Sequence, residues 1–348
     1  MANLKNICVL RLSALGDCIN AFGFIGGLKK ADPNLDVSMI IDKRFASMFK
    51  DANGNDLIPL YTVDFKNEGL KSILSLKKEL KGKTFDALLN IQTSIKASLV
   101  SLAVKAPLKI GYDNARSREG QRFFVNKTAP ASDNPHVLAG FISFAKALGY
   151  DNVTPFWDFK LEDSELCEIR KKLPEKPIFA IAPASAKAEK NWTVKGYSAL
   201  AKLAIEKGFA PVLLGSKAPI ELNLSKAIAD TVGNGVINLC GKTTLRQMLC
   251  ILKIAKAALC PDSGTMHAAS AVGTPVIGLF ARHSEKRVGP WNYMNLCVSV
   301  YDKLAKSELN GKEAPWRYRV KQEHAMEQIT IDSVKDMFLK VLKEMDYE

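Results

Sequence analysis

The residues best suited to chemistry lie between positions 258 and 290. An apolar run over 258–261 ends in the turn Asp262-Ser263-Gly264, and a helix of small residues containing His267 follows before a second apolar run over 276–280. This order of strand, turn, helix and strand predicts a βα(β) unit. Its turn should lie at the carboxyl end of a parallel sheet, where open α/β folds bind their ligands.

Such a turn is suited to binding an anion. The first amides of a helix have no partner within the helix, and the aligned peptide dipoles make that end positive, so a pyrophosphate is the expected ligand. Gly264 lets the backbone approach a ligand closely, Asp262 and Ser263 can cap the turn or hold the ligand, and the Thr265 amide extends the group of donors. An ordinary capped helix after a buried strand has the same sequence, so this stretch alone leaves both interpretations open.

Four further side chains occupy positions where chemistry or a plain structural role is possible. Asp17 follows the first apolar run in a glycine-containing turn, where it can act as a general base or simply stabilise a helix amino end. Lys190, after the run 178–181, can neutralise a phosphate or lie on the surface. Glu221, after a later strand, can accept from a ribose or begin a helix, and His267 can donate to a phosphate or pack in a core.

The surrounding pattern predicts two similar α/β halves with mostly parallel sheets and a cleft between them. Residues 151–177 change in composition and predict the link between the halves, because the strand and helix order starts again at residue 178. We expect a first domain over 1–160 and a second over 175–325, with a terminal helix at about 331–348 packing back on the first. Expected strands cover 7–12, 37–41, 85–91, 109–111, 178–181, 210–215, 236–239, 258–261 and 276–280.

Composition narrows the class of protein. The chain has 348 residues and a formal charge of +13, which suits phosphorylated ligands, an anionic membrane surface or nucleic acid. No stretch is apolar enough for a membrane span, and the amino terminus does not resemble a signal peptide, so we expect a cytoplasmic protein.

Seven cysteines without a CxxC pair and four scattered histidines indicate no metal site. The GxGxxG, P-loop and GxSxG motifs are absent, and no pattern of nucleic-acid recognition is present.

Four motifs, RLSALGD (11–17), KNW (190–192), GSKAPIE (215–221) and PDSGTMHAASAVGTPVIGLF (261–280), together resemble the ADP-heptose lipopolysaccharide heptosyltransferases of glycosyltransferase family 9. Segments QTSIKAS (92–98), IGYDNARSREGQ (110–121) and HVLAGF (136–141) resemble the heptosyltransferase I branch. Two features depart from the commonest pattern: Ser263 stands where threonine is frequent, and GDCIN (16–20) follows neither main subgroup closely.

The resemblance implies a GT-B fold, with two Rossmann-like domains and parallel sheets facing a central cleft. It implies an inverting, metal-independent transfer of heptose from ADP-L-glycero-D-manno-heptose to Kdo of Kdo-lipid A, whose Kdo is phosphorylated in some members. It also implies a monomer that needs no cofactor and contacts the inner leaflet of the cytoplasmic membrane peripherally. The alternatives are heptosyltransferase II-type transfer to heptose, a GT-B nucleotide-sugar epimerase and a non-catalytic module that binds phosphorylated glycans.

The resemblance also assigns roles to individual residues. Asp17 matches the catalytic aspartate of the family. The positions that match donor contacts are Lys190, Glu221, Asp262, Ser263, Gly264, Thr265 and His267, with Lys190 on phosphate and Glu221 on ribose. The positions that match acceptor contacts are Arg11, Ser13, Lys96, Arg116 and Arg118.

Overall fold

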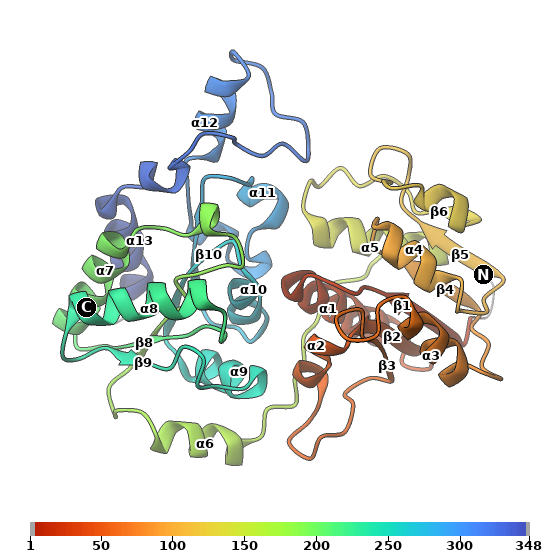
Figure 1. The fold of residues 1–348 in the computed structure, drawn as a ribbon, viewed down its shortest axis with the longest axis horizontal. Helices are drawn as coiled ribbons and strands as arrows, with labels where there is room; N and C mark the ends of the chain where they lie inside the picture. Colours follow the sequence, from red (N-terminus) through yellow and green to blue (C-terminus); the bar gives the residue numbers. More distant parts are fainter. Residues whose placement is uncertain (1–3, 346–348) are drawn as a thin grey trace. The chain divides into compact units, whose positions relative to one another are not determined.

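Two parallel sheets organise the chain, each in its own unit of the computed structural model (Figure 1). The units are Met1–Lys160 and Leu161–Glu348, called unit 1 and unit 2 below. The structure describes residues 4–345. Residues 1–3 and 346–348, which the sequence assigns to the first domain and the terminal helix, lie outside the described residues.

Unit 1 alternates strands with helices, as the sequence pattern predicts. Its strands are β1 (Asn6–Leu10), β2 (Asp36–Asp42), β3 (Leu60–Val63), β4 (Ala87–Asn90), β5 (Leu108–Gly111) and β6 (Lys127–Thr128). Its helices are α1 (Leu15–Ala31), α2 (Lys43–Ala46), α3 (Lys71–Glu79), α4 (Ile95–Ser101) and α5 (Val137–Leu148), with short 3₁₀ turns η1 (Ser47–Phe49) and η2 (Gln121–Phe124).

The sheet of unit 1 has the order β3-β2-β1-β4-β5-β6, and all of its strand pairs are parallel. Strands β1 and β4 are apolar and buried except for Asn6, half-buried at the start of β1, and the buried Asn90 at the end of β4, as expected for central strands covered on both faces. The chain leaves β1 toward one edge of the sheet and reaches β4 on its other side. The carboxyl ends of β1 and β4 therefore form the topological switch point, where open α/β sheets bind ligands.

Residues 151–160 pack against α1 and belong to unit 1. The indole Nε1 of Trp157 donates to the carbonyl of Ile19 over 2.8 Å. A Cβ added to Gly26 would lie 2.1 Å from the carbonyl oxygen of Phe156, so glycine at this position allows the two backbones to approach. The change in composition at residue 151 therefore does not mark the start of a free linker; the chain divides after Lys160.

Unit 2 repeats the arrangement. Its strands are β7 (Ile178–Ile181), β8 (Ala210–Leu213), β9 (Ile237–Asn238), β10 (Ala257–Pro261), β11 (Val276–Phe280) and β12 (Cys297–Ser299). Its helices are α6 (Asp163–Lys171), α7 (Val194–Glu206), α8 (Pro219–Val232), α9 (Leu245–Ile254), α10 (Gly264–Ala271), α11 (Glu285–Val288), α12 (Tyr301–Glu308) and α13 (Ile331–Glu344), with 3₁₀ turns η3 (Ala188–Lys190), η4 (Trp291–Leu296) and η5 (Ala325–Gln328).

The sheet of unit 2 has the order β12-β11-β10-β7-β8-β9, which is the order of unit 1 read from the opposite edge. Helix starts agree with local sequence signals: Thr193 caps α7 through its side chain, Pro219 is the first residue of α8, and Thr244 with Gln247 forms a capping box on α9. The switch point of unit 2 lies between β7 and β10.

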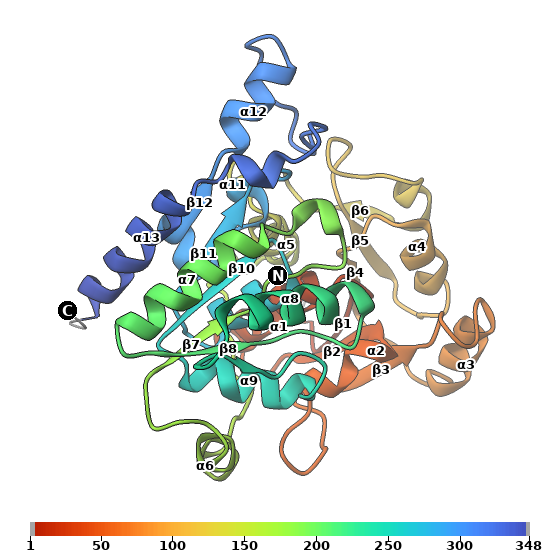
Figure 2. The same ribbon diagram turned by 60° about the vertical axis from the view of Figure 1, so that its left-hand side comes forward.

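Helix α13 packs on unit 2, beside α7 in Figures 1 and 2. Its buried Phe338 meets Phe179 of β7 and Phe209 with ring centroids 4.6 and 6.0 Å apart. The expectation that this helix returns to the first domain is therefore wrong. Its apolar spacing fixes which face is buried, but it does not specify which sheet receives that face.

Candidate active site

Three polar side chains meet at the switch point of unit 2. The ammonium of Lys190, at the end of η3 after β7, donates to the Asp262 carbonyl over 2.6 Å and to its carboxylate oxygen Oδ2 over 3.0 Å. His283, just after β11, places its Nδ1 2.6 Å from the same Oδ2. Strands β7, β10 and β11 are adjacent in the sheet, so side chains distant in sequence converge at one edge.

The Asp262 carboxylate is held ionised by this cluster. Burial of the group opposes ionisation, but the His283 hydrogen bond and the positive charges of Lys190, His283 and His267 outweigh it, so the pKa of Asp262 lies well below its usual value. The side chains of Lys190 and Asp262 are 16% and 14% exposed. An ammonium has three donors and two of them are used here, so a third remains for a further anion.

Helix α10 begins directly beside this cluster. Ser263 is its N-cap, with extended backbone and a hydroxyl that accepts from the Met266 amide over 3.4 Å. Gly264 and Thr265 form the first turn, whose amides have no partner within the helix. His267 is buried at 8% exposure one turn along, on the same helix. The arrangement provides a positive helix end next to a lysine, which suits a phosphate group.

The carboxylate of Glu221 is fixed at the carboxyl end of the neighbouring strand β8. The amide of Ser216 donates to Oε2 over 2.6 Å, and its hydroxyl donates to Oε1 over 2.7 Å. A Cβ added to Gly215 would lie 2.9 Å from Oε2, so a side chain there would displace the carboxylate. Each carboxylate oxygen can accept a second hydrogen bond, so Glu221 keeps capacity for a ligand hydroxyl.

A small hollow opens at this edge of unit 2. It is lined by residues of η3, of the turn after β10, of the end of β11 with the segment that follows it, and of η5. They are Lys190, Asp262, Leu279, Phe280, Ala281, Arg282, His283 and Met326.

In unit 1, Asp17 and Arg11 pair at the corresponding switch point. The Arg11 guanidinium bonds the Asp17 carboxylate at Oδ2, and its other nitrogen Nη1 donates to the Ile91 carbonyl over 2.8 Å. Helix α1 begins at Leu15, so Asp17 lies in its first turn. Its side chain is 28% exposed, and the described residues donate no hydrogen bond to Oδ1. Asp17 can therefore be both a helix-end aspartate and an oriented base.

Gln92 holds the loop between β1 and α1. Its side-chain oxygen accepts from the amides of Leu12 and Ser13 over 2.8 and 3.2 Å, and its Nε2 donates to the Ser94 hydroxyl over 2.8 Å. Ser13, an expected acceptor contact, is half-buried in this loop. The contacts connect the ends of β1 and β4, the two strands of the switch point.

The remaining expected acceptor residues lie in different environments. Lys96 is exposed on α4, with its ammonium 5.5 Å from the Phe65 ring centroid. Arg118 is exposed and donates to the carbonyls of Ala115 and Ser117 within its own loop.

The Arg116 side chain stabilises the loop between β5 and β6. It is 9% exposed, and its Nη2 donates to the carbonyls of Ser132 and Asn134, both over 3.1 Å. A Cβ added to Gly140 would lie 2.4 Å from its Nη1, so the guanidinium packs directly on α5. This geometry argues against the expected contact with an acceptor.

Sequence reasoning missed two residues of the site, His283 and Gln92. His283 was not singled out, although it follows strand β11 by three residues, and polar residues just past a strand of a parallel sheet are candidates by position. Gln92 lies two residues after β4 and shares that signal.

Among residues 4–345, no group of three or more histidine, cysteine, aspartate or glutamate side chains is arranged to hold a metal ion. No helix in the described part of the chain combines the length and apolar character of a membrane span.

The sequence profile of glycosyltransferase family 9 (heptosyltransferase) matches residues 73–316. The chain belongs to this family. This glycosyltransferase is 37% identical over 339 residues to the lipopolysaccharide core heptosyltransferase OpsX of Haemophilus influenzae, covering 95% of each chain.

Two solved structures share the fold of this family 9 glycosyltransferase. A family 9 glycosyl transferase from Veillonella parvula superposes with a TM-score of 0.78 at 20% identity, covering 98% of this chain and 97% of that one. The Escherichia coli heptosyltransferase WaaC with ADP gives 0.73 at 19% identity, covering 97% and 99%. The predicted α/β architecture with two Rossmann-like halves, the GT-B fold, is thus confirmed.

Proposed function

We propose that this glycosyltransferase moves heptose from ADP-L-glycero-D-manno-heptose to a Kdo residue of Kdo-lipid A, in the synthesis of the lipopolysaccharide inner core. The observation that carries the proposal is the cluster of Lys190 and Asp262 at the amino end of α10, because it offers a fixed positive site for a diphosphate. Family membership and the core heptosyltransferase named among the relatives support the sugar and the acceptor class.

The donor occupies unit 2 in this proposal. Its diphosphate accepts from the third donor of Lys190 and from the first amides of α10, at Gly264 and Thr265. Its ribose donates to the Glu221 carboxylate, which Ser216 holds in place. Asp262 orients Lys190 and carries a charge that keeps the ammonium at this edge of the sheet.

The reaction is a single displacement with inversion. The Kdo hydroxyl oxygen forms a bond to the anomeric carbon of heptose as the bond from that carbon to the β-phosphate oxygen breaks, and ADP leaves with the electron pair. Asp17 takes the hydroxyl proton, with Arg11 fixing Oδ2 so that Oδ1 faces the proton to be removed. Charge accumulating on the β-phosphate is stabilised by donors already in position, which is the usual source of a large share of catalysis. The step as written needs neither metal nor cofactor.

The acceptor occupies unit 1, where Lys96 and Arg118 present exposed positive charge to its carboxylate and phosphate groups. The protein acts as a monomer on the cytoplasmic side and contacts the inner leaflet peripherally. The net charge of +13 supports such contact, because basic surfaces are attracted to anionic lipid headgroups.

The decisive experiment mixes ADP-heptose with a set of Kdo-lipid A acceptors, with and without phosphate on Kdo, and measures products by mass spectrometry. Asp17→Asn should lower turnover by about 10²- to 10⁴-fold, the usual effect of removing a general base, and leave ADP binding nearly unchanged. Comparable turnover in that variant would remove Asp17 from the mechanism. A new nucleotide sugar formed from donor alone would indicate an epimerase, and binding without any product would indicate a non-catalytic module.

A further inference from the structure

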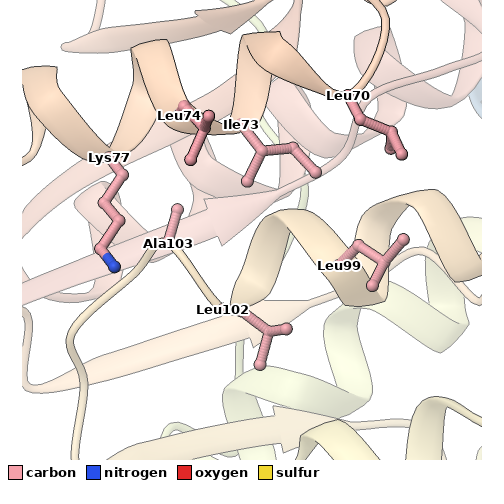
Figure 3. Close-up of a pocket in the computed structure, with 7 residues that line it drawn as sticks. All are labelled: Leu70, Ile73, Leu74, Lys77, Leu99, Leu102 and Ala103. Carbon is pink, nitrogen blue, oxygen red and sulfur yellow. The ribbon is translucent and has the colours of Figure 1, made fainter.

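An apolar pocket lies between α3 and α4 of unit 1 (Figure 3). This open pocket has a volume of about 310 Å³. Leu70 is 64% exposed, Leu74 62% and Leu102 60%, so much of its wall faces solvent. The lining residues are Leu70, Ile73, Leu74, Lys77, Leu99, Leu102 and Ala103.

The exposed side chains at this pocket are not needed for the core of unit 1. The core face of α3 is formed by Leu76, which is fully buried in a cluster with strand residues such as Leu88 and Val63. Leu74 lies two residues before Leu76 and therefore points to a different side of the helix. Ile73 and Ala103 of the pocket still contact the core cluster, whereas Leu70, Leu74 and Leu102 form a second apolar surface that the described residues leave exposed.

Exposed apolar surface is concentrated at this place. Eight large hydrophobic side chains of the described residues are exposed, and the five that exceed 40% all lie on α3, α4 or the adjoining η2, or are cap residues of these helices. These five are Leu70, Leu74, Ile95, Leu102 and Phe123. The other three reach at most 39%, on different elements. Scattered exposed leucines need no explanation, but a cluster of this kind marks an interaction surface.

We call the surface formed by Leu70, Leu74, Ile95, Leu102 and Phe123 the α3–α4 face. The chain around it is rich in positive charge. Between residues 66 and 105 the chain has eight lysines and three carboxylates. Lys71, Lys77 and Lys78 of α3 are exposed beside the leucines, and the guanidinium of Arg122 lies 4.8 Å from the Phe123 ring centroid. A second copy of this face would be repelled by like charge, whereas an anionic surface with an apolar interior complements it.

We propose that the α3–α4 face docks this protein onto an anionic lipid bilayer, with its leucines inserted among the headgroups and its lysines against the lipid phosphates. Long basic side chains cover apolar surface while their charged ends stay in water, which suits this boundary. The choice of a bilayer as partner rests on the proposed function, since a lipid-linked acceptor lies in such a membrane.

The test measures sedimentation of the full chain with vesicles of phosphatidylglycerol and phosphatidylethanolamine, and with neutral phosphatidylcholine vesicles as reference. Leu74→Gln combined with Leu102→Gln should lower the partition coefficient by roughly tenfold, and the deficit should persist at high salt because it is apolar in origin. Leu339→Gln, at an exposed leucine of α13, is the matched control and should bind like the wild type. Glutamine is a good helix former, so none of these changes should unfold the protein.

Two readouts keep this proposal separate from the proposed function. Heptosyl transfer to a deacylated, water-soluble Kdo acceptor should be the same in the wild type and the double leucine variant. Loss of transfer by the wild type with intact vesicle binding would overturn the proposed function but not the docking face. Equal vesicle binding by the double variant and the wild type would overturn the docking face. So would a wild-type dimer in sedimentation velocity that the double variant converts to monomer.

Discussion

Replacing Lys190 by methionine should weaken both the fold of unit 2 and its affinity for ADP. The substitution keeps most of the apolar stem and removes the ammonium that bonds the Asp262 carbonyl and carboxylate. Breaking a buried ion pair by removing one partner costs about 3–5 kcal/mol. Here His283 stays on Oδ2 and both partners keep some exposure, so we expect about 2 kcal/mol. For a unit of this size that corresponds to a fall in Tm of roughly 4–8 °C.

The expected loss of ADP affinity comes from the third N–H donor of the Lys190 ammonium, which we assign to the diphosphate. A hydrogen bond between charged partners contributes about 1.5–3 kcal/mol, so Lys190→Met should weaken ADP binding by roughly 10- to 150-fold. Calorimetric titration of ADP gives the affinity, and differential scanning calorimetry of the full chain gives Tm. Arg282→Met is a useful control, because Arg282 lines the same hollow without bonding Asp262.

A double-mutant cycle separates the two effects of Lys190. In Asp262→Asn the carboxylate charge is absent, so adding Lys190→Met should cost little further stability but still lower ADP affinity. If ADP binding in Lys190→Met stayed within about twofold of the wild type, Lys190 would be only a structural partner of Asp262, and the phosphate assignment would be wrong.

Two further predictions concern the pH dependence of stability at Asp262 and the separate roles of Arg116 and Arg118. The pKa of Asp262 is lower in the folded than in the unfolded chain, so its ionisation stabilises the fold above the ordinary carboxyl pKa, and that contribution is lost as the pH falls toward the folded value. The stability difference between the wild type and Asp262→Asn should therefore shrink in urea titrations below about pH 4, and a constant difference down to pH 3 would contradict this linkage. In unit 1, Arg116→Ala should lower the free energy of unfolding by about 2–4 kcal/mol, because it removes a buried guanidinium that donates to two carbonyls, of which, in the described part of the chain, only that of Asn134 keeps another donor, the Ser132 hydroxyl. Arg118→Ala should change it by less than about 0.5 kcal/mol while raising KM for the acceptor, and equal loss of stability in the two variants would refute this division of roles.

The sequence predicts most of the central strands, because each of them is a nearly continuous apolar run. Strands β1, β4, β7, β10 and β11 are buried over nearly all their residues, and each follows from composition and length. Strands β3, β6 and β12 were not predicted. They are edge strands of two to four residues. Both residues of β6, Lys127 and Thr128, are polar and exposed, and the apolar stretches of β3 and β12 are too short to be told from loop sequence.

The positions of the site residues in the fold could be predicted better than the contacts that these residues make. Asp17, Lys190, Glu221 and Asp262 could be placed at the carboxyl ends of strands from the sequence alone, because a parallel sheet collects those ends at one edge. The role of Arg116 could not be predicted. A polar, glycine-flanked loop gives no sign that one of its arginines is buried against α5.

The chain's own sequence determines the alternation of strands and helices, because burial on both faces and 3.6-residue periodicity are properties of neighbouring residues. Only the tertiary structure decides that Lys190 meets Asp262 across 72 residues, that Gln92 holds the loop after β1, and that α13 packs on unit 2. These contacts depend on which strands are adjacent and which face a helix covers. Both are set by packing of the whole sheet, for which local spacing gives no information.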